Sequence, residues 1–250
     1  MKALITGASS GIGRDIARVL AERGCELILV ARREERLRQL ADELPVPCEI
    51  IPLDLGTREN CVLLFERTKS SGVDILVNNA GFGLYGPFDE GDAQRELAML
   101  DLNVAAMQLL MKLFLRHFEQ RGGGYILNVA SSAAFMPGPL LACYYATKAY
   151  VLRLTQAVYE ELRRKKSPVY VGALCPGPVA TEFDDVAGTS FSIRQMSSRR
   201  VAEIAVKGMF RGKTVIVPGF VMRAGTALSR FVPTKLLLRI SYRIQKKKGK

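Results

Sequence analysis

Residues 2–13 have the sequence KALITGASSGIG, in which a short apolar run leads directly into a turn rich in glycine. The apolar run, Lys2–Thr6, is nearly continuous, as expected of a strand that is buried on both faces of a parallel sheet. Apolar residues then recur at helical spacing from Ile12 to Leu20, with charged residues on the opposite face. This stretch therefore predicts a β-strand, a tight turn and an α-helix in immediate succession.

Similar apolar runs, rich in β-branched residues, recur along the chain between helical patterns. We expect strands at Lys2–Thr6, Glu26–Ala31, 49–53, 75–78, 125–129, Val169–Leu174 and 214–217. Alternation of strand and helix implies right-handed crossovers and one parallel sheet with helices on both faces. The expected fold class is α/β, a Rossmann-type doubly wound sheet of about seven strands. We expect a single domain, with its core at residues 1–220 and a basic amphipathic extension at 221–250.

The composition excludes several classes of protein. A chain of 250 residues with 48% hydrophobic and 24% charged residues is neither disordered nor collagen-like. It has no run of 18 apolar residues and no signal-peptide pattern, so no membrane-spanning helix is expected. The five cysteines are odd in number and never in CxxC spacing, which predicts free thiols in a reducing compartment and a cytoplasmic protein. With one histidine, no metal site is expected.

The net charge of +12 belongs to the C-terminal part of the chain. Residues 194–250 hold 15 basic residues against one acid, Glu203, whereas residues 1–193 hold 21 basic and 23 acidic residues. Near the end, Leu236 and Ile240 begin an apolar stripe with basic residues one position earlier, which predicts a helix with one apolar and one cationic side. We favour packing of its apolar side on the same fold or on a second subunit. Weak contact with an anionic membrane is the alternative, and no nucleic acid is expected.

Three glycines in the first turn, Gly7, Gly11 and Gly13, allow a sharp bend and the close approach of a pyrophosphate. The helix that follows would direct its free N–H groups at this phosphate. Where the second strand ends, an NAD-binding protein usually has an acidic residue for the ribose, but this chain has Arg32 and Arg33. A guanidinium can bind a 2′-phosphate through two hydrogen bonds, so the sequence predicts NADP(H) in preference to NAD(H). The alternative is that both arginines are solvated charges at a helix start.

Further along the chain, Tyr144 and Lys148 are four residues apart in a helical pattern and so share one face of a helix. Ser131 follows the fifth expected strand, and the sequence NNAG at 78–81 ends the fourth. Together with the glycine turn, these motifs resemble the short-chain dehydrogenase/reductase family over residues 2–220. The sequence VPG after the last strand and the basic tail are similar to those of the DltE-like reductases, near the 3-oxoacyl and hydroxysteroid reductases.

The resemblance implies a catalytic role for four residues. Tyr144 would be the general acid in reduction and the base in oxidation. The ammonium of Lys148, together with the cationic nicotinamide in the oxidation direction, would lower its pKa, and Lys148 would also hold the nicotinamide ribose. Ser131 would bind the carbonyl oxygen, and Asn103 would hold a water that links Lys148 to solvent. Ser132 could replace Ser131 because strand alternation turns one of the two away. The residues expected to contact the cofactor are Gly7, Ser9, Ser10, Gly11, Ile12, Gly13, Arg32, Arg33, Asp54, Leu55, Asn79, Ala80, Gly81, Tyr144, Lys148, Pro176, Gly177, Val179 and Thr181.

Apolar residues gather in the three segments expected to frame the substrate site, 82–88, 133–143 and 182–198. They are Phe82, Leu84, Tyr85, Phe88, Phe135, Met136, Leu140, Leu141, Phe183, Phe191, Ile193 and Met196. They predict a hydrophobic ketone, aldehyde or secondary alcohol as the substrate, such as a 3-oxoacyl, steroid-like or aromatic compound. Alternatively, most of these side chains only fill the core. We expect no catalytic role for Asp184 and Asp185.

The expected function is that of an NADP(H)-dependent oxidoreductase that transfers hydride between nicotinamide and such a substrate. The alternative is a non-catalytic NADP(H)-binding regulator or scaffold that uses its basic tail on a membrane or nucleic acid. The family resemblance also implies a homodimer or homotetramer, assembled through the long helices that carry Asn103 and Tyr144.

Overall fold

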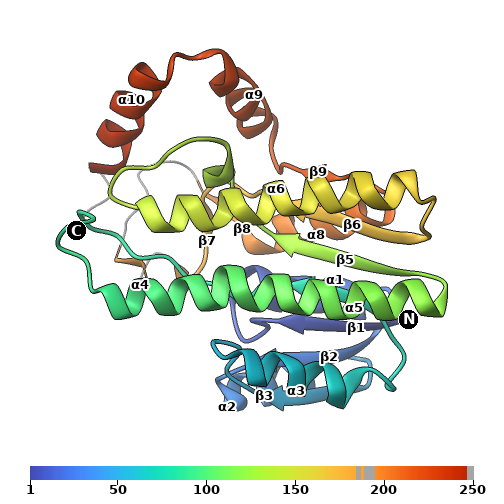
Figure 1. The fold of residues 1–250 in the computed structure, drawn as a ribbon. Helices are drawn as coiled ribbons and strands as arrows, with labels where there is room; N and C mark the ends of the chain where they lie inside the picture. The colour runs from blue at the N-terminus through green and yellow to red at the C-terminus, as the bar shows by residue number, and fades with distance from the viewer. Residues whose placement is uncertain (184–186, 189–194, 247–250) are drawn as a thin grey trace.

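Seven parallel strands form the centre of the molecule, in the order β3-β2-β1-β4-β5-β6-β9 (Figure 1). The structure is a computed structural model that describes residues 1–183, 187–188 and 195–246. The strands are β1 (Lys2–Thr6), β2 (Glu26–Ala31), β3 (Cys48–Pro52), β4 (Val73–Asn78), β5 (Gly124–Val129), β6 (Val169–Leu174) and β9 (Val215–Ile216). The expected Rossmann-type sheet in a single domain is confirmed, and β1, β2 and β6 have the expected bounds.

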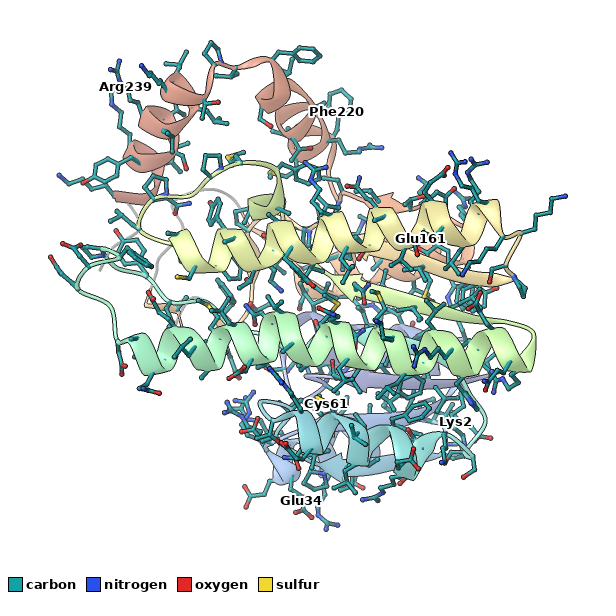
Figure 2. The ribbon with its side chains drawn as sticks, in the orientation of Figure 1. Lys2, Glu34, Cys61, Glu161, Phe220 and Arg239 are labelled. Carbon is teal, nitrogen blue, oxygen red and sulfur yellow. The ribbon has the colours of Figure 1, made fainter. Side chains whose placement is uncertain are left out.

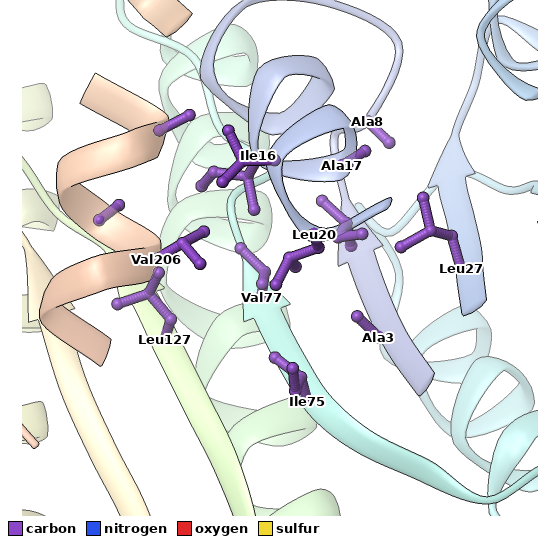
Figure 3. Packing of buried hydrophobic residues seen from close by; sticks show 14 of the residues in the cluster. Ala3, Ala8, Ile16, Ala17, Leu20, Leu27, Ile75, Val77, Leu127 and Val206 are labelled. Atoms are coloured by element: carbon purple, nitrogen blue, oxygen red, sulfur yellow. The ribbon is translucent and has the colours of Figure 1, made fainter. Parts of the chain in front are cut away.

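Helices cover both faces of this sheet (Figure 1). One face packs against α1 (Gly11–Ala21), α2 (Glu34–Glu43) and α8 (Ser198–Phe210). The other face packs against α3 (Arg58–Thr68), α5 (Met107–Arg121) and α6 (Ala142–Arg164). Successive strand residues point to opposite faces, so Ala3 and Ile5 of β1 join one core and Leu4 joins the other. Figure 3 shows the first core, in which side chains of α1 and α8 meet over β1 and β4.

One long helix lies along the second face. It consists of α4 (Ala93–Leu100), a π-helical segment η1 (Asp101–Ala106) and α5. By length and composition, Ala93–Arg121 is the one helix in the described part of the chain that could span a membrane, where the sequence pattern predicted none. Phe114 and Phe118 of this helix are completely buried in the second core. Because core helices pass the same test, the length and composition of this helix are weak evidence for a membrane span.

The remaining elements lie beyond the carboxyl ends of the strands. They are η2 (Ser132–Phe135), the paired strands β7 (Val179–Ala180) and β8 (Met196–Ser197), α9 (Phe220–Leu228), η3 (Ser229–Phe231) and α10 (Thr234–Lys246). Residues 220–246 rise from the body as an arch, seen at the top of Figure 1. The C-terminal helix was expected, but its buried residues are Ser241 and Gln245, and its apolar stripe is exposed. The expected packing of this stripe on the same fold is therefore wrong, whereas its packing on a second subunit, the other part of the favoured interpretation, stays a prediction.

Three buried polar side chains connect β4, β5 and α6. The amide of Asn78 donates to Asn128 Oδ1 at 2.9 Å, and the amide of Asn128 donates to Thr155 Oγ1 at 2.9 Å. Without Asn128, the Asn78 amide keeps only a long bond of 3.5 Å to the Met107 carbonyl. The chain of hydrogen bonds thus stabilises the middle of the sheet below the site.

Asn128→Ala should lower the free energy of unfolding by about 1–3 kcal/mol, because it leaves buried polar groups without their partners. Urea denaturation followed by circular dichroism measures the loss. Asn60→Ala is the matched control, because the Asn60 amide bonds the Asp54 carbonyl at the surface. Equal losses in the two variants would contradict the prediction.

Candidate active site

The site lies at the carboxyl ends of β1 and β4, which are neighbours in the sheet. The strand order reverses here: successive strands are added from β1 toward β3 on one side and from β4 toward β9 on the other. The hydroxyl of Thr6, at the end of β1, donates to the Val77 carbonyl at 3.3 Å. The same oxygen accepts from the backbone N–H groups of Asn79 and Ala80 at 2.9 and 3.0 Å. The side-chain amide of Asn79 in turn donates to the carbonyls of Thr6 and Gly7 at 2.9 and 3.1 Å. These bonds join the glycine turn to the NNAG segment.

The glycine turn has no room for side chains. Gly7 and Gly11 have φ values of +65° and +55°, and a Cβ on Gly7 would lie 2.9 Å from the Ala80 Cα. A Cβ on Gly13 would lie 2.5 Å from the Gly7 carbonyl oxygen, so Gly13 allows α1 to pack closely on the turn. At the start of α1, Ser10 makes no side-chain cap, and the first turn of the helix has no acidic side chain. Bare backbone beside an uncapped helix N-terminus fits the pyrophosphate of a dinucleotide.

A cavity of about 390 Å³ extends from this turn to the start of α6. All the residues expected to contact the cofactor line it except Gly13, and three of the four expected catalytic residues line it. The fourth, Asn103, does not. Of the expected apolar substrate residues, Phe82, Leu141 and Phe183 line the cavity, while Phe88 is exposed. Four residues considered from the sequence lie outside the described part of the chain: Asp184, Asp185, Phe191 and Ile193.

Tyr144 and Lys148 lie one turn apart near the start of α6. The Lys148 Nζ is 5.8 Å from the centroid of the Tyr144 ring and donates to the carbonyl of Val129, the last residue of β5, at 2.9 Å. The side chain of Lys148 is buried, and burial lowers its pKa to about 8. Lys148 therefore connects the helix to the sheet and has an ammonium that titrates near neutral pH.

Burial has the largest effect on the pKa of Tyr144. It raises this pKa above its ordinary value, and the side chain of Ser131 opposes part of the effect. The expected lowering included the charge of a bound nicotinamide and stays a prediction. Ser131 and Ser132 both line the cavity, and Ser131 is the one whose side chain lowers the pKa of the phenol.

Asn103 lies in the π-helical segment η1 and is buried. Its side chain accepts from the Phe82 N–H at 3.0 Å and donates to the Phe82 carbonyl at 2.9 Å and to Thr147 Oγ1 at 3.2 Å. The amide thus connects the segment after β4 to α6. The water that Asn103 was expected to hold stays a prediction, and the observed bonds indicate a positioning role.

The opposite end of the cavity is basic. The guanidinium of Arg33 donates to the hydroxyls of Ser9 and Ser10 at 3.1 and 2.9 Å and forms an ion pair with Glu182 at 2.8 Å. Arg32 is largely exposed and lies 3.8 Å from the Asp54 carboxylate. Arg33 is therefore the arginine that contacts the glycine turn. Glu182 could not be predicted as a site residue, because no motif marks it and its partners lie 149 and 146 residues earlier in the chain.

Glu182 belongs to a segment that covers the cavity. Thr181 precedes Glu182 in the chain, and the Thr181 Cγ2 would lie 3.0 Å from a Cβ placed on Gly11. The residue after Glu182, Phe183, has its ring centroid 5.1 Å from that of Tyr144. Three consecutive residues thus contact the glycine turn, the basic end and the phenol.

Comparison with known proteins gives a consistent result. A sequence profile of the family described as short chain dehydrogenase matches residues 1–190. A short-chain dehydrogenase from Sphingobium yanoikuyae, solved in complex with NADPH, is 32% identical, with a TM-score of 0.81 and coverage of 93% of this chain and 96% of that one. The bulky-bulky ketone specific alcohol dehydrogenase from Comamonas testosteroni is 32% identical, with a TM-score of 0.79 and coverage of 92% and 91%. The 3-ketoacyl-(acyl-carrier-protein) reductase from Brucella melitensis, complexed with NADH, is 28% identical, with a TM-score of 0.76 and coverage of 87% and 96%.

A parallel sheet with a glycine turn where its strand order reverses is the architecture of a dinucleotide-binding protein. The chain belongs to the short-chain dehydrogenase/reductase family, since the family profile covers most of its length. It is accordingly an oxidoreductase of this type that uses a nicotinamide cofactor, as the solved relatives do.

We expect kcat/KM for the cofactor to fall as the pH rises through about 8. The lowered pKa means that Lys148 is charged below this pH and neutral above it, and kcat/KM reports the ionisation of the free enzyme. Initial rates between pH 6 and pH 10 measure the profile. Lys148→Arg keeps its charge over this range, so its residual activity should not show the fall. A profile of the unmodified enzyme that stays level to pH 10 would contradict the prediction.

Proposed function

We propose that the protein is an NADP(H)-dependent carbonyl reductase or alcohol dehydrogenase, with Tyr144 as its general acid and base. The observation that carries this proposal is the buried ammonium of Lys148 one helical turn from Tyr144, with its Nζ 5.8 Å from the centroid of the phenol ring and Ser131 lining the same cavity. This group lies in the cavity that begins at the glycine turn. A proton donor and a dinucleotide site in one cavity are what hydride transfer to a carbonyl requires.

The chemistry assigns a task to each side chain. The nicotinamide, when bound, supplies hydride to a carbonyl carbon in reduction and accepts it back in oxidation. Ser131 donates a hydrogen bond to the substrate oxygen, and Tyr144 gives its proton to that oxygen as it becomes an alkoxide. The raised pKa keeps Tyr144 protonated and so suits the acid role in reduction. In oxidation the phenol has to lose its proton, and the positive charge on Lys148 favours the phenolate.

The substrate class follows from the walls around Tyr144. Phe82, Leu141 and Phe183 line this end of the cavity, and the ring of Phe183 packs beside the phenol. We therefore propose an apolar ketone, aldehyde or secondary alcohol, such as a 3-oxoacyl, steroid-like or aromatic compound. The similarity to the Comamonas alcohol dehydrogenase, which is specific for bulky-bulky ketones, supports this class.

The proposed preference for NADP(H) rests on the basic end of the cavity. β2 ends at Ala31 without an acidic residue, and Arg33 lies against the two serines of the glycine turn. The NADPH complex of the Sphingobium relative supports this preference, whereas the NADH complex of the Brucella relative indicates that relatives of this chain use either cofactor.

We also propose a homodimer or homotetramer in the cytoplasm. Leu97 and Leu100 of α4 and Tyr150 of α6 are exposed large side chains on the long helices, as a subunit contact there would require. All five cysteines are free thiols, which supports a reducing compartment.

Tyr144→Phe should reduce NADPH-dependent turnover of apolar ketones by at least about a hundredfold, because it removes the proton donor. NADPH binding, followed by the fluorescence of the bound nucleotide, should persist. Tyr145→Phe is the matched control, since Tyr145 also lines the cavity but lacks the spacing to Lys148. Turnover that survives in Tyr144→Phe would reject the assignment. Absence of turnover by the unmodified enzyme across a broad ketone panel would favour the non-catalytic alternative.

Arg33→Ala should weaken NADPH binding by about 10–100-fold and NADH binding much less, because a charge-assisted bond to the 2′-phosphate is lost. Arg32→Ala should act in the same direction. Fluorescence titration with each nucleotide measures both. Arg38→Ala is the control, since Arg38 pairs with Glu34 on α2.

Glu182→Gln completes this experiment. Glu182 forms ion pairs with Arg33 and Arg36 and would repel a phosphate placed between them. Its substitution should therefore tighten NADPH binding and leave NADH binding nearly unchanged. Glu203→Gln is the matched control, because it removes a carboxylate that also pairs with two arginines but belongs to α8.

The proposed preference for NADP(H) would be contradicted if Arg33→Ala weakened the binding of NADPH and NADH equally.

A further inference from the structure

The arch formed by residues 220–246 leaves large apolar side chains in solvent. Nine of the sixteen exposed large apolar residues in the described part of the chain belong to it, although it holds only a small share of the residues. On α9 and η3, Phe220, Val221 and Phe231 are 76%, 80% and 85% exposed. The others are Leu228, Leu236, Leu238, Ile240, Tyr242 and Ile244. A patch of this kind marks a surface that contacts something else.

The helix α10 is attached to the body by its polar side. Ser241 Oγ donates to the Pro137 carbonyl at 3.1 Å, and the Gln245 amide donates to the hydroxyl of Tyr145. The hydroxyl of Tyr85 donates to the Gln245 carbonyl at 3.2 Å. A surface helix usually buries its apolar stripe and exposes its polar side. In α10 the polar side contacts the body and the apolar stripe is exposed, because the bonds of Ser241 and Gln245 fix the orientation of the helix.

The arch is also strongly basic. Its described, exposed basic residues are Arg223, Lys235, Arg239, Arg243 and Lys246. The sequence contains no acidic residue after Glu203, so nothing in the arch neutralises them. Figure 2 labels Phe220 on α9 and Arg239 on α10, so the arch carries both apolar and basic side chains. The partner must therefore accept both apolar groups and positive charge.

We propose that the arch is a docking surface for an anionic lipid membrane. Anionic headgroups would neutralise the basic residues, and the apolar side chains would enter the boundary of the acyl chains. A contact between the arches of two copies is disfavoured, because it would place the same uncompensated basic residues against each other. A nucleic acid would match the charge but leave Phe220 and Phe231 in water. The bilayer accommodates both properties.

Docking would bring the cavity close to the bilayer. Tyr145, which is bonded to Gln245 of α10, lines the cavity. Gly177 also lines the cavity, and a Cβ on Gly177 would lie 2.9 Å from the Cγ of Met222 in α9. Both helices of the arch thus contact its wall. An apolar substrate partitions into lipid, so docking would place the substrate site next to the membrane in which the substrate is dissolved. This consequence rests on the proposed function, whereas the docking itself does not.

Co-sedimentation with vesicles tests the proposal. At low salt the protein should pellet with vesicles of phosphatidylcholine and phosphatidylglycerol at about 3:1, and not with phosphatidylcholine alone; salt of about 0.5 M should release it. Phe220→Ser/Phe231→Ser and Arg239→Glu/Arg243→Glu should each weaken binding by at least about tenfold. Arg211→Glu/Lys213→Glu is the matched control: it changes the charge equally, on exposed residues between α8 and β9, and should bind as the unmodified protein does.

Three results would overturn docking on lipid. The first is no pelleting with anionic vesicles at low salt, and the second is an equal loss in the control pair. The third is a change in oligomeric mass of the arch variants in sedimentation velocity without vesicles, which would identify a contact between copies. NADPH oxidation with a water-soluble ketone should be the same in all variants. Failure of that assay in the unmodified protein would count against the proposed function and leave the vesicle result unaffected.

Discussion

The hydroxyl of Thr6 joins the end of β1 to the segment that follows β4, and the site is built at this junction. It donates to one carbonyl of β4 and accepts two backbone N–H groups of the segment that follows β4. Parallel strands end at the same edge, but their loops diverge, so a site there needs bonds across the gap. Thr6 and the amide of Asn79 supply them and leave the glycine turn with no space for a Cβ. The cavity, the helix N-terminus and the catalytic side chains are arranged around this junction.

Burial has opposite effects on the two titrating groups beside the cavity. It raises the pKa of the Tyr144 phenol and lowers that of the Lys148 ammonium to about 8, so it favours the neutral form of each. A lysine that lowers the pKa of a neighbouring tyrosine has to keep its charge, and here the sheet helps through the Val129 carbonyl at 2.9 Å. The protein alone therefore prepares a proton donor. Its action as a base depends on further positive charge near the phenol.

Most of the fold and much of the candidate site could be predicted from local sequence patterns. Continuous apolar runs located the seven strands, and glycine spacing and the four-residue step from Tyr144 to Lys148 located the two ends of the cavity. The π-helical segment around Asn103 could not be predicted, since it depends on bonds to residues far along the chain. Glu182 was missed for the same reason. Packing of the α10 stripe on the same fold was predicted wrongly, because the hydrophobic pattern of a helix does not show which of its sides contacts the rest of the chain.

The segment from Thr181 to Phe183 contacts both ends of the cavity. Its first residue lies against Gly11, its second pairs with the arginines, and its third packs on the phenol. Glu182 and Phe183 are consecutive residues whose Cα atoms are about 3.8 Å apart, so a displacement of one is felt by the other. The ion pairs of Glu182 with the arginines and the packing of Phe183 on the phenol therefore hold the same short segment at two places along the cavity.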